Sequence, residues 1–271
     1  MILQSTDAIV AFQKGRAMNK SALLSVESLT VKFGGLTALS NIHLDLHPGE
    51  VVGIIGPNGA GKTTLFNALS GIVTPTSGKL KLHNKEQRWL APHELATNGI
   101  SRTLQGVGLF GDLTVLENVM VGATVTKTTG LIAALLGRDR KAEVALRDKA
   151  KLALEQTNCT SLANRLAAAL SYPDTKRVAI ARALVSEPKI LLLDEPAGGL
   201  GPEDIEWMKS LIRNIKAHTS VLLVEHHMDI VMSICDRIYV LNFGELIAEG
   251  TPAEVRENPD VITAYLGKTE V

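Results

Sequence analysis

The sequence predicts an α/β fold interrupted by a helical section, and three observations lead to this prediction. Two aliphatic runs, Val51–Ile55 and Ile190–Leu193, are continuous rather than alternating, which is typical of strands buried on both faces of a sheet. The first run leads through a glycine-rich stretch into a helical pattern. The section from 104 to 170 is rich in Ala, Leu, Lys and Arg, with few strand signals. A chain of 271 residues is long enough for one large domain or two small ones.

The N-terminal part of the chain holds the first predicted elements. Loose alternation over Leu23–Phe33 predicts a strand, and His43–Leu46 predicts a shorter second one. Val51–Ile55 then runs into Gly56, and Thr63–Gly71 has helical spacing. A strand, a glycine loop and a helix in this order form the context that a phosphate-binding loop requires.

The later elements alternate between helices and strands. Helices are predicted at Arg138–Gln156, Val178–Val185 and Ile205–Ile215, and Pro188 follows the second of them as a breaker. Strands are predicted at Ile190–Leu193, Ser220–Val224, Arg237–Leu241 and Leu246–Glu249. The section 104–170 is therefore expected to be a helical insertion into an α/β core.

Composition argues against several classes of function. Lys+Arg and Asp+Glu both number 28, a balance that argues against a bulk electrostatic grip on nucleic acid. Cys159 and Cys235 have no metal-ligand spacing and are expected to be reduced, structural residues of a cytoplasmic protein. No run approaches the ~20 apolar residues of a transmembrane helix. In the tail Met1–Lys20 basic residues follow the apolar patch, the wrong order for a secretory signal, and Met18 is an alternative start.

The glycine-rich stretch satisfies the pattern GxxxxGK[ST] in full. Its residues are Gly56, Pro57, Asn58, Gly59, Ala60, Gly61, Lys62 and Thr63, followed by Thr64. Glycines let the backbone curl round a phosphate chain with its N–H groups pointing inward. The following helix adds a positive N-terminus, Lys62 a full charge, and the Thr63 hydroxyl a ligand for Mg²⁺. This is a P-loop, and it predicts ATP binding within a P-loop NTPase fold.

A P-loop needs an acidic partner for its metal, and the run Ile190–Leu193 supplies one. The strand delivers Asp194 to its end, where the carboxylate can hold Mg²⁺. Glu195 follows directly and can orient or deprotonate the attacking water as general base. The alternative is a solvated turn with two acids, which the P-loop upstream disfavours.

The order of motifs resembles that of the ATP-binding cassette (ABC) ATPases. The motifs are the P-loop, Gln105, Leu170-Ser171-Tyr172, Asp194-Glu195-Pro196 and His226, over nearly the whole chain from about Leu23. The resemblance implies a RecA-like core with an antiparallel β subdomain and a helical subdomain. It implies one ABC ATPase domain over 23–271 after a tail at 1–22, with the helical subdomain at about 105–172 and a C-terminal extension at about 246–271.

The resemblance also implies roles for single residues. Phe33, just before Ala38-Leu39, is similar to the aromatic residue that stacks on adenine. Gln105 resembles the lid glutamine that contacts Mg²⁺ and water and couples to membrane subunits. Ser171 belongs to the signature that contacts a second subunit's ATP. His226 resembles the switch histidine that senses the γ-phosphate.

A competing interpretation makes His226 and His227 a metal pair. Adjacent residues on an extended segment point to opposite faces, so we expect them not to share an ion. The other histidines have no partner at ligand spacing and are expected at the surface: His43, His47, His83, His93 and His218.

Further likeness narrows the subfamily to the Liv-type, or branched-chain amino-acid, importer ATPases. It lies in Leu109–Val119, in Pro196–Leu200 and in the C-terminal stretch Gly250–Gly267. The insertion Gly130–Arg140, with an apolar and then a basic half, resembles that group as well. Lipopolysaccharide-export ATPases share the Tyr-Leu-Gly ending, so the insertion decides between the two groups.

The signature departs from the family pattern LSGGQ, since it reads Leu-Ser-Tyr-Pro-Asp over 170–174. Pro173 replaces a glycine whose N–H faces the partner's γ-phosphate, and proline has no N–H. Asp174 replaces a neutral glutamine and brings a carboxylate near a polyanion. Gly201 also stands where the family usually carries Asp or Asn. The alternative is lineage drift that nearby Lys176 or Arg177 offsets.

Because the family works as head-to-tail dimers, these losses are expected to affect the partner's ATP. We therefore expect a heterodimer, in preference to a homodimer, with one competent site built on Lys62 and Glu195. The leading function is ATP-driven import on the inner face of the cell membrane. Permeases would dock near Gly106–Glu117, and a periplasmic or surface binding protein would supply the solute. A lipid or lipopolysaccharide exporter, a non-transport ABC ATPase and a P-loop kinase or GTPase are the alternatives.

Overall fold

A computed structural model gives the fold of residues 21–103, 108–123 and 140–266. Residues 1–20 of the predicted tail, the lid glutamine Gln105, most of the Gly130–Arg140 insertion and the last five residues lie outside this range. The chain forms two compact units, one of Met1–Pro92 with Ile215–Val271 and one of His93–Asn214. None of the helices within the described residues has the length and hydrophobicity needed to span a bilayer.

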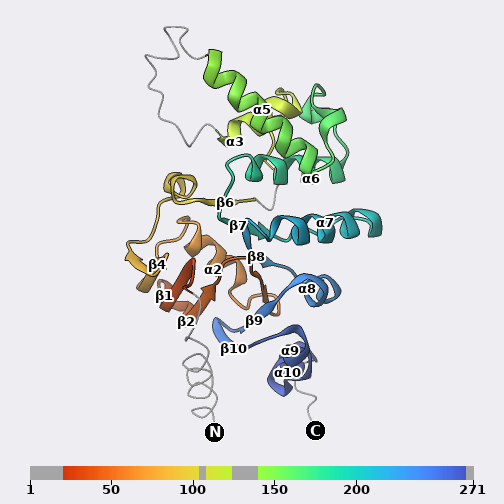
Figure 1. Ribbon diagram of the computed structural model, residues 1–271. Coiled ribbons are helices and arrows are strands. Elements are labelled where there is room, and N and C mark those ends of the chain that lie inside the picture. The colour runs from red at the N-terminus through yellow and green to blue at the C-terminus, as the bar shows by residue number, and fades with distance from the viewer. Residues whose placement is uncertain (1–20, 104–107, 124–139, 267–271) are drawn as a thin grey trace. The chain divides into compact units, whose positions relative to one another are not determined.

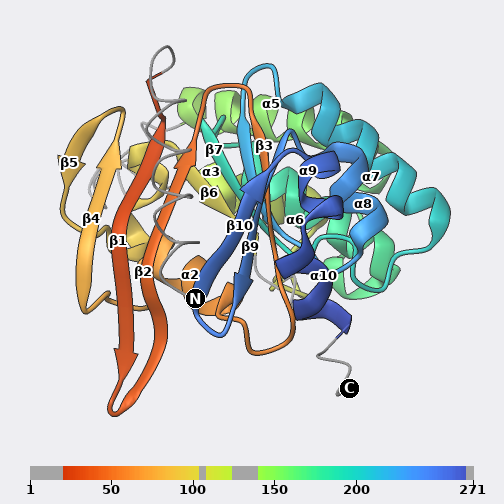
Figure 2. The same cartoon turned by 90° about the horizontal axis from the view of Figure 1, so that it is seen from below.

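The first unit contains an antiparallel four-stranded sheet, in the order β2-β1-β4-β5, whose strands lie side by side in Figure 2. Its strands are β1 (Leu24–Phe33), β2 (Leu36–Leu46), β4 (Ser77–Leu82) and β5 (Lys85–Gln87). In β1 alternate residues are buried, as expected for a strand with one face on a core. β2 begins seven residues before the predicted His43 and pairs with β1 along its whole length. Its first two residues are exposed, so they give no alternating pattern.

The same unit holds a parallel group of strands in which β3 lies between β8 and β9. Its strands are β3 (Val51–Ile55), β8 (Ser220–Val224), β9 (Arg237–Asn242) and the antiparallel neighbour β10 (Glu245–Gly250). All five residues of β3 and all five of β8 are buried, which is why both strands read as continuous aliphatic runs. The helices of this unit are α2 (Lys62–Leu69), α8 (Met228–Ile234), α9 (Pro252–Glu257) and α10 (Pro259–Leu266).

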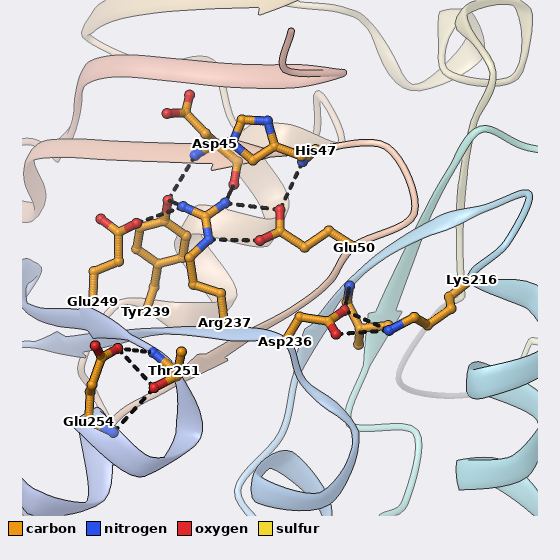
Figure 3. A network of polar contacts seen from close by, with 11 residues as sticks. Asp45, His47, Glu50, Lys216, Asp236, Arg237, Tyr239, Glu249, Thr251 and Glu254 are labelled. Atoms are coloured by element: carbon orange, nitrogen blue, oxygen red, sulfur yellow. Dashed lines mark hydrogen bonds and ion pairs between the residues drawn. The ribbon is translucent and has the colours of Figure 1, made fainter. Parts of the chain in front are cut away.

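A buried polar network ties the start of β3 to β9 and β10 (Figure 3). The Arg237 guanidinium donates to Glu50 at 2.8 Å and to Glu249 at 2.6 Å. It also donates to the Tyr239 hydroxyl at 2.7 Å, while Lys216 pairs with Asp236 at 2.8 Å. Because each buried charge has partners, the network fixes the strand that leads into the P-loop.

The second unit pairs β6 (Ile100–Arg102) in parallel with β7 (Ile190–Asp194). Three helices, α3 (Val115–Ala123), α5 (Arg140–Gln156) and α6 (Tyr172–Leu184), pack together around an apolar cluster that includes Val119, Leu154 and Val178 (Figure 1). The unit also contains α7 (Pro202–Ile215) and short 3-10 turns at 92–94, 96–98, 160–162 and 167–169.

Cys159 and Cys235 are both free and buried.

Candidate nucleotide-binding site

The P-loop follows β3 directly and ends at the start of α2. Gly56, Gly59 and Gly61 all have positive φ, at 153°, 80° and 102°. A Cβ on Gly56 would lie 2.2 Å from the carbonyl oxygen of Leu241, so only glycine fits at the first position. The Gly244 N–H donates to the Ala60 carbonyl at 3.0 Å, which holds the loop against the β9–β10 hairpin. The loop therefore has the tight, glycine-dependent curl that the sequence predicts.

Lys62 is the first residue of α2 and its side chain turns back over the loop. The residue is 8% exposed. Its ammonium donates to the carbonyl oxygens of Gly56 at 2.7 Å and Pro57 at 2.9 Å. The positive charge therefore lies inside the ring of the P-loop, where an anionic phosphate chain would bind. Thr63 is exposed beside it and Thr64 is half-buried, so both are accessible at the first turn of α2.

Phe33 ends β1, and half of the residue is exposed. It pairs with Leu36 across the β1–β2 hairpin. Further along β2, the Ala38 carbonyl oxygen lies 3.0 Å from where a Cβ on Gly61 would stand. The hairpin that carries Phe33 thus continues into a strand that contacts the P-loop, which suits an aromatic residue stacking on a bound base.

His226 and His227 follow β8, and here our expectation about side-chain direction is wrong. Their ring centroids lie 4.2 Å apart, and the Nδ1 atoms lie 3.5 and 3.2 Å from Oε2 of the fully buried Glu225. The strand ends at Val224 and His227 stands at the N-cap of α8, so both histidines lie beyond the strand and its side-chain alternation does not apply.

The three ligand atoms of this cluster lie within 4.8 Å of one another, so spacing alone does not separate the two histidines. However, Glu225 Oε2 already accepts the backbone N–H groups of His226 at 2.7 Å and His227 at 3.4 Å. Nδ1 of His227 also lies within hydrogen-bond distance of this oxygen, at 3.2 Å, so hydrogen bonds that satisfy a buried carboxylate account for the cluster and orient the His227 ring.

In the second unit, Asp194 ends β7 and its carboxylate binds Arg102 on β6 at 2.8 Å. The two side chains are 5% and 8% exposed. No sequence pattern points to Arg102, because the partners are 92 residues apart and meet through the β6–β7 pairing. The Asp194 carboxylate therefore pairs with the Arg102 cation at the strand end where Mg²⁺ is predicted to bind.

Glu195 follows with φ 46°, a left-handed backbone that non-glycine residues rarely adopt. The residue is half-buried. The Lys176 ammonium of α6 donates to its carbonyl oxygen at 3.0 Å and to that of Pro196 at 3.2 Å. No sequence pattern predicts this contact, because the two segments are distant in the chain.

Ser171 caps α6, which begins six residues before the predicted Val178. Its hydroxyl oxygen accepts the Asp174 N–H at 3.3 Å, and the hydroxyl donates to the Asp174 carboxylate at 2.7 Å. Pro173 occupies the second position of the helix, where an N–H has no intrahelical partner in any case. The helix therefore tolerates the proline in its first turn.

Lys176 and Arg177, the residues that could offset the altered signature, are engaged elsewhere. Lys176 is buried against the loop after β7. Arg177 pairs with Asp204 at 2.7 Å and lies over the Trp207 ring, 4.5 Å from its centroid.

Comparisons with known proteins agree with the fold and the P-loop. The family model for ABC transporters matches residues 39–198. The chain therefore belongs to the ABC transporter ATP-binding family, and it is an ATP-hydrolysing subunit of that class. A second model, described as branched-chain amino acid ATP-binding cassette transporter, matches residues 245–271.

Named relatives make the likeness more specific. The chain is 46% identical to the high-affinity branched-chain amino acid transport ATP-binding protein LivG of Escherichia coli K12, over 91% of this chain and 98% of LivG. It is 43% identical to BraF of Pseudomonas aeruginosa, described in the same words, with the same coverage. The lipopolysaccharide export ATP-binding protein LptB of E. coli is 32% identical, with coverage of 91% and 98%.

Solved structures give the same fold. The ADP conformation of MJ1267, an ATP-binding cassette of an ABC transporter, superposes with a TM-score of 0.79 at 32% identity and covers 91% of this chain and 99% of that one. A dimeric MJ0796 cassette bound to ADP and Pi gives 0.72 at 28% identity, with coverage of 84% and 98%. The predicted P-loop NTPase fold and family are thus confirmed, while the roles of single residues remain predictions.

Proposed function

We propose that this chain is the ATPase subunit of an importer for branched-chain amino acids or a similar small organic solute. The observation that carries the proposal is the 46% identity to LivG over 91% of the chain. The match of residues 245–271 to the branched-chain model supports it. The lower identity to LptB, 32%, disfavours the exporter alternative. The chain would lie on the inner face of the membrane, bound to permeases.

The proposed nucleotide contacts follow from the geometry of the first unit. Phe33 stacks on adenine, the P-loop from Gly56 to Thr64 wraps the phosphates, and the Lys62 ammonium neutralises them. His226, held by Glu225 at 3.5 Å, senses the γ-phosphate.

The hydroxyl of Thr63 and the carboxylate of Asp194 fit the preference of Mg²⁺ for oxygen ligands, and we propose them as its ligands together with Gln105. When bound, Mg²⁺ neutralises charge on the β- and γ-phosphates. Glu195 then acts as the base that orients and deprotonates the attacking water. Ser171 contacts the nucleotide of a second subunit.

We further propose that the functional ATPase is a heterodimer with one competent site. Pro173 leaves the signature without one N–H donor, and the Ser171 hydroxyl proton is directed to Asp174. One lost charge-assisted hydrogen bond costs about 1.5–3 kcal/mol, roughly ten- to a hundredfold in affinity. The burial of Lys176 and the pairing of Arg177 with Asp204 weigh against the alternative of compensated drift.

The experiment is to purify the chain alone and with the second ATPase encoded beside it, and to measure phosphate release. We expect slow turnover by the chain alone and rapid turnover by the pair, which loses activity when Glu195 becomes glutamine. Brisk hydrolysis by a homodimer would refute the asymmetric pair but not the ATPase itself.

The solute follows from a separate test. We expect a binding protein from the same gene cluster to bind leucine, isoleucine or valine in calorimetry. Neighbouring genes for lipid-export components instead would favour the exporter.

We also propose the domain organisation stated for the sequence, with a tail at 1–22 before one ATPase domain over 23–271.

A further inference from the structure

The Lys176 side chain leaves its helix and enters the loop that follows β7. Only 8% of the residue is exposed. Its ammonium donates to the backbone carbonyls of Glu195 and Pro196, at 3.0 and 3.2 Å, and lies 5.5 Å from the centroid of the Tyr172 ring. Among the residues that the structure describes, no carboxylate forms an ion pair with it. An ammonium that is buried against carbonyls and a ring is costly to desolvate, and the two hydrogen bonds to the carbonyls offset part of that cost.

A second contact fixes the same loop. The Tyr172 hydroxyl donates to the Gly198 carbonyl at 3.2 Å. Gly199 has φ 74°, and a Cβ there would come within 2.8 Å of the Tyr172 ring. The first two turns of α6 therefore hold the loop 195–199 at both ends.

The Lys176 ammonium binds the backbone at Glu195, a residue with an unfavourable conformation. Glu195 has φ 46°, in a left-handed region that a side chain with a Cβ disfavours. Its carbonyl oxygen is the atom that Lys176 binds. Because the orientation of this peptide sets the direction of the Cα–Cβ bond, it also sets where the Glu195 carboxylate can reach.

We propose that Lys176 is a positioning residue for Glu195, acting through the backbone and not on the nucleotide. The inference rests on the proposed role of Glu195 as general base. The residue that positions the base then lies on α6, the helix capped by the signature residue Ser171.

The test uses the assembled pair of ATPase subunits with this chain as wild type, Lys176→Met or Lys176→Arg. Methionine keeps the length of the stem and removes the donor, whereas arginine keeps a donor. A displaced catalytic group costs up to about a hundredfold in rate. We expect Lys176→Met to lower kcat about 10- to 100-fold, with KM and the affinity for a fluorescent ATP analogue within about twofold, and Lys176→Arg to recover most of kcat.

The matched control is Lys149→Met, which removes an exposed lysine of the same unit that pairs with Glu187 at 2.8 Å. It should leave kcat unchanged. In a Glu195→Gln background, Lys176→Met should cause no further loss, because residues that act as a unit are not additive. Tyr172→Phe, which removes only the hydroxyl, should lower kcat by a smaller factor and covers the case in which Lys176→Met does not fold.

Wild-type kcat in Lys176→Met or in Tyr172→Phe, a parallel loss of nucleotide affinity, or an additive loss in the double variant would each overturn the inference. Its failure is distinguishable from failure of the proposed function. If Glu195→Gln keeps full turnover, the assignment of the base is wrong; if Glu195→Gln is inactive and Lys176→Met is active, only the positioning role is wrong.

Discussion

Asp194 and Arg102 form an ion pair in which both charges are almost completely withdrawn from water. Their side chains are 5% and 8% exposed and meet at 2.8 Å. Two buried charges are tolerated only as a pair, since removal of one leaves the other without compensation. The pair holds the carboxylate at the strand end where the metal is proposed to bind.

Replacement of Arg102 by methionine is therefore expected to lower the free energy of unfolding by about 3–5 kcal/mol. The measurement is urea denaturation without nucleotide. Lys149→Met breaks an exposed pair and should cost at most about 1 kcal/mol. Equal losses in the free energy of unfolding for the two substitutions would show that the buried pair contributes no more to stability than the exposed one.

Glu195→Gln tests the residue assigned as base. The substitution is close to isosteric and leaves the carbonyl that Lys176 binds in place, so we expect ATP affinity to stay within about threefold while phosphate release slows about 10²- to 10⁴-fold. Lys62→Ala should instead weaken nucleotide binding itself, because it removes the charge inside the P-loop. Unchanged turnover in Glu195→Gln would exclude the base role.

At the scale of elements, α6 carries two of the proposed roles in one helix. Its N-terminus carries the signature, and its second turn holds the loop after β7 through Lys176. Pro173 suits the helix because it stands in the first turn, where its missing N–H breaks no bond. The same missing N–H is a loss only for a ligand at that terminus.

Pro173→Gly separates these two consequences. Glycine restores the N–H but adds backbone freedom to the unfolded chain, so the free energy of unfolding should fall by about 0.5–1 kcal/mol. Nucleotide affinity of the closed pair should rise, by up to roughly ten- to a hundredfold. The measurements are urea denaturation and the concentration of ATP at which half of the subunit pairs are closed. An unchanged nucleotide affinity would contradict the proposed defect.

The sequence predicts best the elements whose residues all share one environment. β3 and β8 match their predicted bounds because every residue in each is buried. β5 is exposed at all three positions and β6 has only three residues, so neither gives a pattern. α6 begins six residues before the predicted Val178, and its first turn contains Pro173, a residue that is accepted at a helix start and gives no helical signal of its own.

The candidate site shows the same division. The P-loop, Asp194 and Glu195 are contiguous motifs, so sequence alone locates them. The Arg102–Asp194 and Lys176–Glu195 contacts join distant segments and depend on the folded backbone. The direction of the His226 and His227 rings depends on where β8 ends, which a rule for extended chains cannot supply.

At the scale of the whole molecule, the buried thiol of Cys235 and the buried phenol of Tyr239 should make the free energy of unfolding fall as pH rises into the alkaline range. Burial raises the pKa of the Cys235 thiol above its ordinary value of 9.0, and burial likewise raises the pKa of the Tyr239 phenol well above 10.0. The folded state therefore keeps protons that the unfolded state releases. Their contribution to stability is fully present below pH 9 and is lost as pH rises toward the folded-state values.

We expect the free energy of unfolding to fall between pH 9 and 11, by up to about 1.4 kcal/mol per pH unit for each group that the unfolded chain has ionised. Urea denaturation at pH 8, 9.5 and 10.5 measures this slope. Cys235→Ala removes the thiol contribution and should make the slope shallower above pH 9. An unchanged slope in that variant would assign the effect to other groups.

The proline at the second position of α6 has an energetic consequence for the transporter as a machine. If the pair hydrolyses ATP at one site only, each closure consumes one ATP where a symmetric pair can consume two. The work available per cycle is then smaller, and so is the steepest solute gradient that the transporter can sustain. A substitution that the fold accommodates without strain would thus set a limit on accumulation inside the cell.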